Sequence, residues 1–163
     1  MDCHYNQLTS LDVSSCTSLS MLNCDGNQLT ILNVRKNNAV FELSQYTAIP
    51  DKNFEQALIE LGYDDTVNGK VLTANISNVD SLYLQKKKIK DLKGIEAFTA
   101  LTHLNCGWNQ LTSLDLSKNT ALTSLDCYNN QLTSLDIGNN TALKYLGCSK
   151  NNLDCDALKA NLK

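Results

Sequence analysis

The sequence has few aromatic residues and no excess of basic charge, and both features narrow the possible functions. Of its 163 residues, 6% are aromatic, and 14 Lys and Arg stand against 17 Asp and Glu, which gives a net charge of −3. A nucleic-acid-binding domain usually carries a basic patch, and a single-strand binder also needs aromatic side chains on which bases can stack. We therefore expect no nucleic-acid partner.

Long apolar runs are missing as well. No run approaches the roughly 18 to 20 apolar residues that a membrane-spanning helix requires, so we expect no membrane span. Met1 is followed by Asp2, Cys3 and His4 rather than by a basic and then apolar leader. The chain thus shows no signal peptide, which a mature fragment of an exported protein would also lack.

Sequence patterns that carry chemistry are scarce. The seven cysteines include no C-x-x-C pair, and the two histidines, His4 and His103, lie far apart. The phosphate-binding pattern GxxxxGK and the nucleophile pattern GxSxG are both absent. We therefore expect no catalytic residues, no cofactor and no metal site, and the chain is not predicted to be an enzyme.

What the sequence does contain is an internal repeat. Blocks that open with leucine alternate between ten and eleven residues, so one full period is a shorter block followed by a longer one. The repeat is clear from Leu101 to Asn152 and again from Leu8 to Ala39, with blocks such as LTHLNCGWNQ, LTSLDLSKNTA, LTSLDCYNNQ and LTSLDIGNNTA. A fixed period of this length is typical of solenoid proteins.

Each block has the form L-x-x-L-x-(C/L/V/I)-x-x-N, and its apolar residues alternate with polar ones. This period of two predicts a strand with one buried face. One block cannot bury that face alone, so we expect the blocks to stack into a parallel solenoid. Because both blocks of the full period carry the pattern, each coil is expected to have two short strands on two faces.

The middle of the chain departs from this rhythm. Residues 46–65 predict an amphipathic helix that begins at Pro50 and Asp51 and ends at Gly62. Its apolar residues recur at helical spacing, at Phe54, Ala57, Leu58 and Leu61. The segment that follows, 79–101, predicts one coil of irregular length.

The block pattern resembles that of leucine-rich repeat proteins, and the 21-residue unit is similar to the repeats of secreted and surface-attached bacterial proteins. The predicted helix followed by IKDLKGIEAFTAL resembles the N-terminal cap and first coil of internalin-like proteins. The resemblance implies a leucine-rich repeat solenoid of the α/β class, built mostly from short parallel β-strands and turns, with a small helical cap in mid-chain. It also implies a bacterial protein that is secreted or located at the cell surface.

We expect four parts: two repeat coils in residues 1–43, a helical cap in 44–78, the main solenoid in 79–152 and a closing segment, predicted to be a short helix, in 153–163. Coils ahead of a cap are unusual, and two coils are fewer than the roughly three that a repeat array needs. Residues 1–43 are therefore a truncated array, rearranged C-terminal coils, or coils that cover the open solenoid end of another molecule in a homo-oligomer.

The cysteines recur with the repeat. Cys106, Cys127 and Cys148 are each one full period apart, as are Cys3 and Cys24, and other blocks have Val, Leu or Ile at the same position. Free cysteine behaves as a small apolar residue, and disulfides between in-register parallel neighbours are geometrically disfavoured. We therefore interpret these cysteines as core residues.

Residues 64–75 loosely follow a calcium-binding loop, with Asp64, Thr66, Asn68 and Gly69 at its first, third, fifth and sixth positions. The twelfth position is Asn75 rather than the glutamate that would bind calcium with two oxygens. A glycine-containing loop after a helix explains the segment without a metal, which is the interpretation we adopt.

Positions that vary between repeats indicate where a ligand would bind. The cysteine-bearing blocks vary most, and they supply the residues of the expected ligand-binding face: His103, Trp108, Tyr128, Tyr145 and Lys150. Exposed aromatic residues often anchor interfaces. We therefore expect a binding or adhesion module that contacts a protein or glycan on a surface. The alternative is a structural spacer or self-associating scaffold element without a ligand of its own.

Overall fold

The computed structural model describes residues 46–154 without a gap, and residues 1, 3–4, 6–13, 15–16, 19, 21–24, 27, 31–33 and 40–42 in the N-terminal part. The chain divides into two compact units, Met1–Thr47 (unit 1) and Ala48–Lys163 (unit 2).

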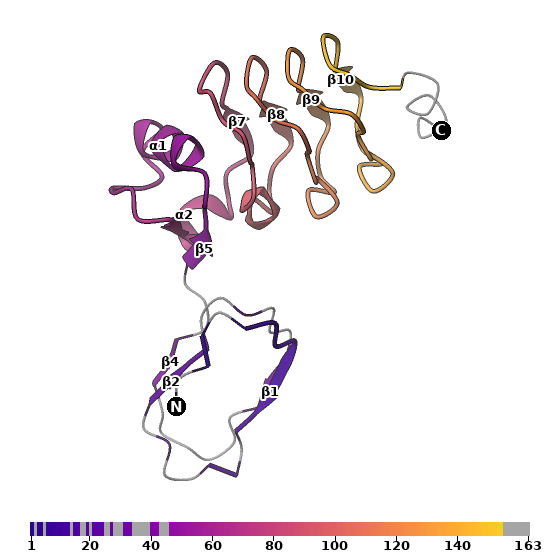
Figure 1. Cartoon of the computed structure of the whole chain (residues 1–163). Helices are drawn as coiled ribbons and strands as arrows, with labels where there is room; N and C mark the ends of the chain where they lie inside the picture. The colour runs from indigo at the N-terminus through magenta and orange to yellow at the C-terminus, as the bar shows by residue number, and fades with distance from the viewer. Residues whose placement is uncertain are drawn as a thin grey trace. The chain divides into compact units, whose positions relative to one another are not determined.

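Unit 2 contains a solenoid with one parallel sheet. Its four strands are β7 (Ser81–Tyr83), β8 (His103–Asn105), β9 (Ser124–Asp126) and β10 (Tyr145–Gly147), and they lie in the order β10-β9-β8-β7. Each strand pairs with the strand of the next coil at equivalent positions, so that the central leucines of all four strands form one row. The coils stack side by side, with one strand arrow in each (Figure 1). The parallel leucine-rich repeat solenoid predicted from the repeat is therefore confirmed.

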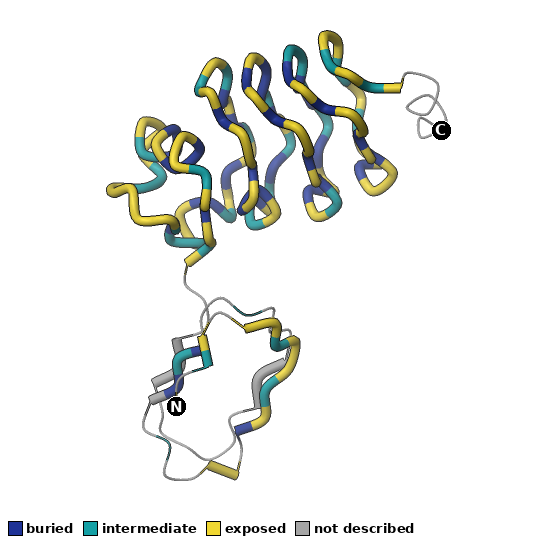
Figure 2. The backbone as a smooth tube through the Cα atoms, viewed as in Figure 1, coloured by how far each residue is buried: buried dark blue, intermediate teal, exposed yellow. Residues whose placement is uncertain are grey.

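The inward positions of the repeat form a single core. Leu104, Cys106, Leu125 and Cys127 are at most 2% exposed, and the leucines that open the blocks are buried with them, except for Leu143, which is half-buried. The buried residues line the inside of the coils that carry β7, β8 and β9, whereas the inward residues of the β10 coil are of intermediate burial (Figure 2). The core therefore follows the sequence period position by position, because each repeat presents the same inward residues to the next.

The asparagines near the end of each block hold neighbouring coils together. The side-chain amide of Asn130 donates to the carbonyl oxygens of Cys106 and Cys127, at 3.0 Å each, and its Oδ1 accepts the N–H of Leu111 at 3.0 Å. Asn109 makes the equivalent bonds one coil earlier. These side chains satisfy main-chain groups that would otherwise be buried without partners.

The other half of each coil in unit 2 differs from the prediction. Residues 111–116 and 132–137 bury their apolar side chains as predicted, but neither segment is a strand. Their carboxylates instead bond to nearby main chain, as Asp115 Oδ1 accepts the N–H of Ser117 and Asp136 Oδ1 accepts that of Gly138. The prediction of two strands in each coil is therefore wrong here, because the alternation of apolar residues fixes which side chains are buried but not the hydrogen bonding of the backbone.

A helix precedes the first coil. Helix α1 (Lys52–Glu60) begins where the side chain of Asp51 accepts the N–H groups of Asn53 and Phe54, and it buries Phe54, Ala57 and Leu58. The helix predicted in this region is confirmed, but it is shorter than the predicted segment, and Leu61 is 41% exposed because it lies just beyond the helix end.

The elements between α1 and the solenoid are short. Strand β5 (Tyr46–Ala48) pairs with β6 (Lys70–Leu72), which leads into α2 (Thr73–Ile76), and a 3-10 turn, η1 (Ile95–Ala97), lies in the first coil.

Unit 1 has strands in both halves of its repeat. Strand β1 (Ser10–Asp12) pairs in parallel with β3 (Ile31–Asn33), and β2 (Met21–Asn23) pairs in parallel with β4 (Val40–Glu42). Asn27 donates to the carbonyl oxygens of Cys3 and Cys24, in the same way as Asn130 bonds in unit 2. Unit 1 is therefore built from the same kind of coil, and here the prediction of two strands is confirmed.

The helix predicted within residues 153–163 lies outside the described residues, apart from Leu153 and Asp154. Leu153 packs half-buried against the core of unit 2.

Candidate binding surface

Two of the predicted ligand-binding residues lie on the outer face of the sheet. His103 begins β8 and Tyr145 begins β10, and both are aligned with Ser124 of β9 between them. His103 is exposed, and Tyr145 is 56% exposed. Because they are two coils apart, about 10 Å at the usual strand spacing, they flank Ser124 rather than touch each other.

The turn that follows each strand places a residue in the left-handed backbone region. Lys86, Trp108, Asn129 and Lys150 have φ values of 59°, 56°, 54° and 55°. Asparagine tolerates this conformation, whereas for most other L-residues it costs roughly 1–2 kcal/mol. The fold therefore does not require an aromatic residue at the position of Trp108.

The indole of Trp108 is held in place by Tyr128 of the next coil. The two ring centroids are 5.7 Å apart and the rings are nearly perpendicular, at 82°. The Trp108 indole N–H donates to the Tyr128 hydroxyl. Gly107 makes room for this arrangement, since a Cβ atom there would lie 2.7 Å from two atoms of the Tyr128 ring.

Two lysines complete the arrangement. The Nζ atoms of Lys86 and Lys150 lie 5.7 Å and 5.6 Å from the centroid of the Trp108 ring. Such cation–π contacts contribute roughly 0.5–1 kcal/mol each at exposed sites. Lys86, Trp108, Tyr128 and Lys150 thus form one aromatic and positively charged surface, called the Trp108 cluster below, in which Trp108 is 41% exposed.

The sequence-predicted residues fall into two groups. Trp108, Tyr128 and Lys150 are brought together in the Trp108 cluster, whereas His103 and Tyr145 lie on the strand face. Lys86 was not among the predicted residues, and neither was the requirement for a residue without a Cβ atom at Gly107. Lys86 stands one coil before Trp108 in the sequence, so extending the repeat into the irregular first coil would have found it.

The cysteines are packed in the core, as predicted. Cys106 and Cys127 are buried free thiols, and Cys148 is half-buried. Burial, followed by the neighbouring Cys127, raises the pKa of Cys106 well above its ordinary value. Burial and then Cys148 raise the pKa of Cys127 to about 12. The thiols of Cys106 and Cys127 therefore stay protonated at neutral pH and are poor nucleophiles and poor metal ligands.

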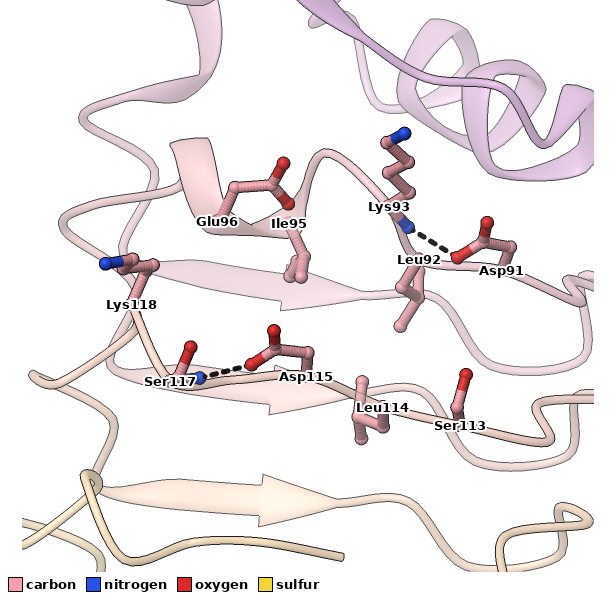
Figure 3. Close-up of a pocket in the computed structure, with 10 residues that line it drawn as sticks. All are labelled: Asp91, Leu92, Lys93, Ile95, Glu96, Ser113, Leu114, Asp115, Ser117 and Lys118. Atoms are coloured by element: carbon pink, nitrogen blue, oxygen red, sulfur yellow. Dashed lines mark hydrogen bonds between the residues drawn. The ribbon is translucent and has the colours of Figure 1, made fainter. Parts of the chain in front are cut away.

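A groove of about 350 Å³ lies between two coils on the other half of the repeat. It is lined by Asp91, Lys93 and Glu96 of one coil and by Ser113, Asp115 and Lys118 of the next (Figure 3). The hydrogen bond from the Ser117 N–H lowers the pKa of Asp115. Charges of both signs line the groove, and no base and nucleophile are paired in it. Among the residues that the structure describes, no three His, Cys, Asp or Glu side chains group to hold a metal ion.

The repeat and the solenoid define the class of the protein, which is a leucine-rich repeat protein, and the comparisons show that it is similar to the bacterial internalins. Internalin J of Listeria monocytogenes serotype 4b is 38% identical over 73 residues, which are 43% of this chain and 8% of that protein. No family model matches the chain.

Solved structures agree with the sequence comparison. The functional domain of internalin J from Listeria monocytogenes, described as including a cysteine ladder, superposes with a TM-score of 0.61 at 35% identity, over 70% of this chain and 26% of that one. An internalin (inlF) from the same species superposes with a TM-score of 0.65 at 26% identity, over 71% of this chain and 34% of that one. The chain thus spans about a third or less of the length of these relatives.

The helices of the described part are too short or too polar to cross a membrane.

Proposed function

We propose that the chain is a non-catalytic binding or adhesion module of a secreted or surface-attached bacterial protein, and that the Trp108 cluster contacts a protein or glycan partner. The observation that carries the proposal is Trp108 itself. It is a large, exposed aromatic side chain in a left-handed backbone position, and the next coil accepts Asn129 at the same position.

The energetics support a role for Trp108 beyond folding. Residues in sparsely populated backbone regions persist where the surroundings enforce them, and they concentrate at ligand sites. Aromatic side chains held rigid in advance also bind with a smaller loss of conformational entropy. The contacts with Tyr128, Lys86 and Lys150 restrain Trp108 in this way and leave part of its ring open to a partner.

The chemistry of the cluster limits what it can bind. Two ammonium groups favour a ligand with acidic groups, while the indole and phenol favour apolar or sugar-ring surfaces. His103 and Tyr145, outward on the strands, extend the proposed surface across the neighbouring face of the same coils.

We propose that residues 44–78 act as the cap of the solenoid 79–152. Both oxygens of Asp51 are used: Oδ1 caps α1, and Oδ2 accepts the N–H groups of Lys90 and Asp91 in the first coil. The Phe54 ring stacks on Phe98, with centroids 6.3 Å apart. These contacts fasten the helix over the apolar end of the first coil, which would otherwise face water.

The test compares the wild-type chain with Trp108→Asn on arrays of glycans and of purified extracellular proteins. Asparagine is the residue found at this position in the next coil, so the variant removes the ring without a new backbone demand. Tyr46→Ala is the matched control, because Tyr46 is an exposed aromatic residue of β5, outside both the Trp108 cluster and the sheet that carries His103 and Tyr145. We expect the wild type and Tyr46→Ala to retain the same partner and Trp108→Asn to lose it at least tenfold. Equal binding by all three, or no binding by any, would favour a spacer.

A further inference from the structure

The Trp108 cluster brings two positively charged side chains to one aromatic ring. The Nζ atoms of Lys86 and Lys150 lie 5.7 Å and 5.6 Å from the centroid of the Trp108 ring, and both lysines are exposed. Within the described part of the chain, neither lysine forms an ion pair with a carboxylate, unlike Lys87, which pairs with Glu60. Two unpaired cations on a chain whose net charge is −3 favour an anionic ligand at this place.

The indole offers a flat apolar surface beside these charges. Trp108 is 41% exposed, and its ring is fixed by the ring and hydroxyl of Tyr128, so part of its surface stays open. The face of an aromatic ring carries partial negative charge and attracts the C–H groups of a sugar ring as well as cations. Because cation–π contacts are weak at exposed sites, the ammonium groups can leave the ring to meet an acidic group.

Amide side chains surround the ring. Asn129 occupies the position of Trp108 one coil later, and Gln110 and Gln131 stand two residues after these positions. Gln110 and Gln131 are exposed and Asn129 is half-buried, and none of the three side chains bonds to another described residue. Each amide has two donor hydrogens and an acceptor oxygen, and sugar hydroxyls also both donate and accept. The surroundings of Trp108 therefore match a saccharide.

The main chain of these turns is already paired. The N–H of Trp108 donates to the carbonyl oxygen of Tyr128, and that of Asn129 donates to the carbonyl oxygen of Ser149. Bound peptides commonly form main-chain hydrogen bonds with a free strand edge or bury side chains in an apolar groove. The groove shown in Figure 3 lies on the other half of the coils. Recognition at the Trp108 cluster therefore depends on side chains, which favours a saccharide over a peptide.

We propose that the Trp108 cluster binds an acidic glycan, a saccharide that carries carboxylate or sulfate groups. This inference rests on the proposed function of the cluster and names the class of its ligand. One sugar ring stacks on the open part of the indole, acidic groups meet Lys86 and Lys150, and the amide of Asn129 bonds to hydroxyls. Because the two lysines belong to coils three apart, about 14 Å at the usual strand spacing, an oligosaccharide fits the row better than a single sugar.

The test presents the full chain with acidic oligosaccharides beside their neutral counterparts. Uronic-acid and sialic-acid oligosaccharides are printed beside their carboxyl methyl esters, and sulfated oligosaccharides beside their desulfated forms. The probe that is retained best is then titrated, with the emission of Trp108, the only tryptophan, as the readout. The variants are Lys86→Gln and Lys150→Gln, which remove a charge and keep a polar side chain. Lys118→Gln is the matched control, because it removes the same charge from an exposed lysine on the other half of the coil.

We expect the retained probes to be acidic and to bind at least about tenfold more tightly than their neutral counterparts. Each cluster variant should weaken binding about fivefold, and Lys118→Gln by no more than about twofold. The ester and desulfated arms show which acidic group is recognised. The proposal is overturned if no glycan binds, if the neutral counterparts bind as tightly, or if Lys118→Gln weakens binding as much as Lys86→Gln.

The same variants separate this proposal from the proposed function. A protein partner that is lost on Trp108→Asn, with no glycan retained, would overturn the acidic-glycan proposal alone and leave the Trp108 cluster as a binding surface. No partner of either kind would overturn both.

Discussion

Replacing Asn130 with alanine should strongly destabilise unit 2. Asn130 satisfies three main-chain groups of two coils: its amide donates to the carbonyl oxygens of Cys106 and Cys127, and its Oδ1 accepts the Leu111 N–H. The side chain is buried, so water cannot easily replace these bonds. Counting about 1–3 kcal/mol for each unsatisfied buried group, and allowing the structure to relax partly, we expect a loss of about 3–5 kcal/mol in the free energy of unfolding.

The assay is urea unfolding at 25 °C followed by tryptophan fluorescence. Trp108 is the only tryptophan of the chain, so its emission reports on unit 2 and not on unit 1. Asn130→Asp should be at least as destabilising as Asn130→Ala, because a carboxylate would face two carbonyl oxygens. The control is Asn139→Ala, an exposed asparagine of the next block, which should change stability by no more than about 0.5 kcal/mol. If Asn130→Ala unfolds within about 1 kcal/mol of Asn139→Ala, the asparagine row does not hold the coils together and the reasoning is wrong.

Three further predictions concern the thiols and the Trp108 cluster. Because the pKa of Cys127 is raised to about 12, its thiol should stay protonated and resist iodoacetamide in the folded chain up to about pH 10, while the exposed Cys16 is modified. Peptide mass spectrometry distinguishes the two cysteines, and labelling of Cys127 as early as Cys16 would contradict its burial. Trp108→Asn should change the free energy of unfolding by less than about 1 kcal/mol, because relief of backbone strain offsets the lost ring contacts. Unfolding followed by circular dichroism measures this change, and a loss above about 2 kcal/mol would mean that the ring is needed for folding. Gly107→Ala should lower the free energy of unfolding by about 1–3 kcal/mol and shift the Trp108 emission, because the new Cβ atom would displace the Tyr128 ring. Gly138→Ala is the control and should have a smaller effect, because the nearest atom there is a side-chain oxygen of Asp136. Equal effects of the two substitutions would refute the packing argument.

Much of the fold is predictable because the information is local and repeated. Leu104, Leu125 and the cysteines are inward in every coil, and the fixed period brings identical positions together whatever the rest of the chain does. Helix α1 was also predictable, because Asp51 and Gly62 mark its ends in the sequence. The absence of strands in residues 111–116 and 132–137 was not predictable, because an extended segment with local hydrogen bonds has the same alternation of apolar residues as a strand.

The candidate sites depend on contacts that a single sequence does not reveal. The repeat places Lys86 one coil before Trp108, but its contact with the Trp108 ring and the need for glycine at position 107 follow only from where the aromatic rings lie. Similarly, the side chain of Glu55 on α1 accepts the N–H groups of Asn68, Gly69 and Lys70, and nothing in the linear sequence indicates that the helix reaches this loop.

The most direct test of the proposed binding surface uses the emission of Trp108. A partner retained on the arrays is titrated into the wild-type chain, and the fluorescence spectrum and its quenching by acrylamide are recorded. If the Trp108 cluster is the binding surface, the emission should change saturably, with the same dissociation constant as calorimetry gives, and the bound partner should protect the half-exposed indole from acrylamide. A partner that binds by calorimetry but leaves both the emission and the quenching of Trp108 unchanged would contradict the account.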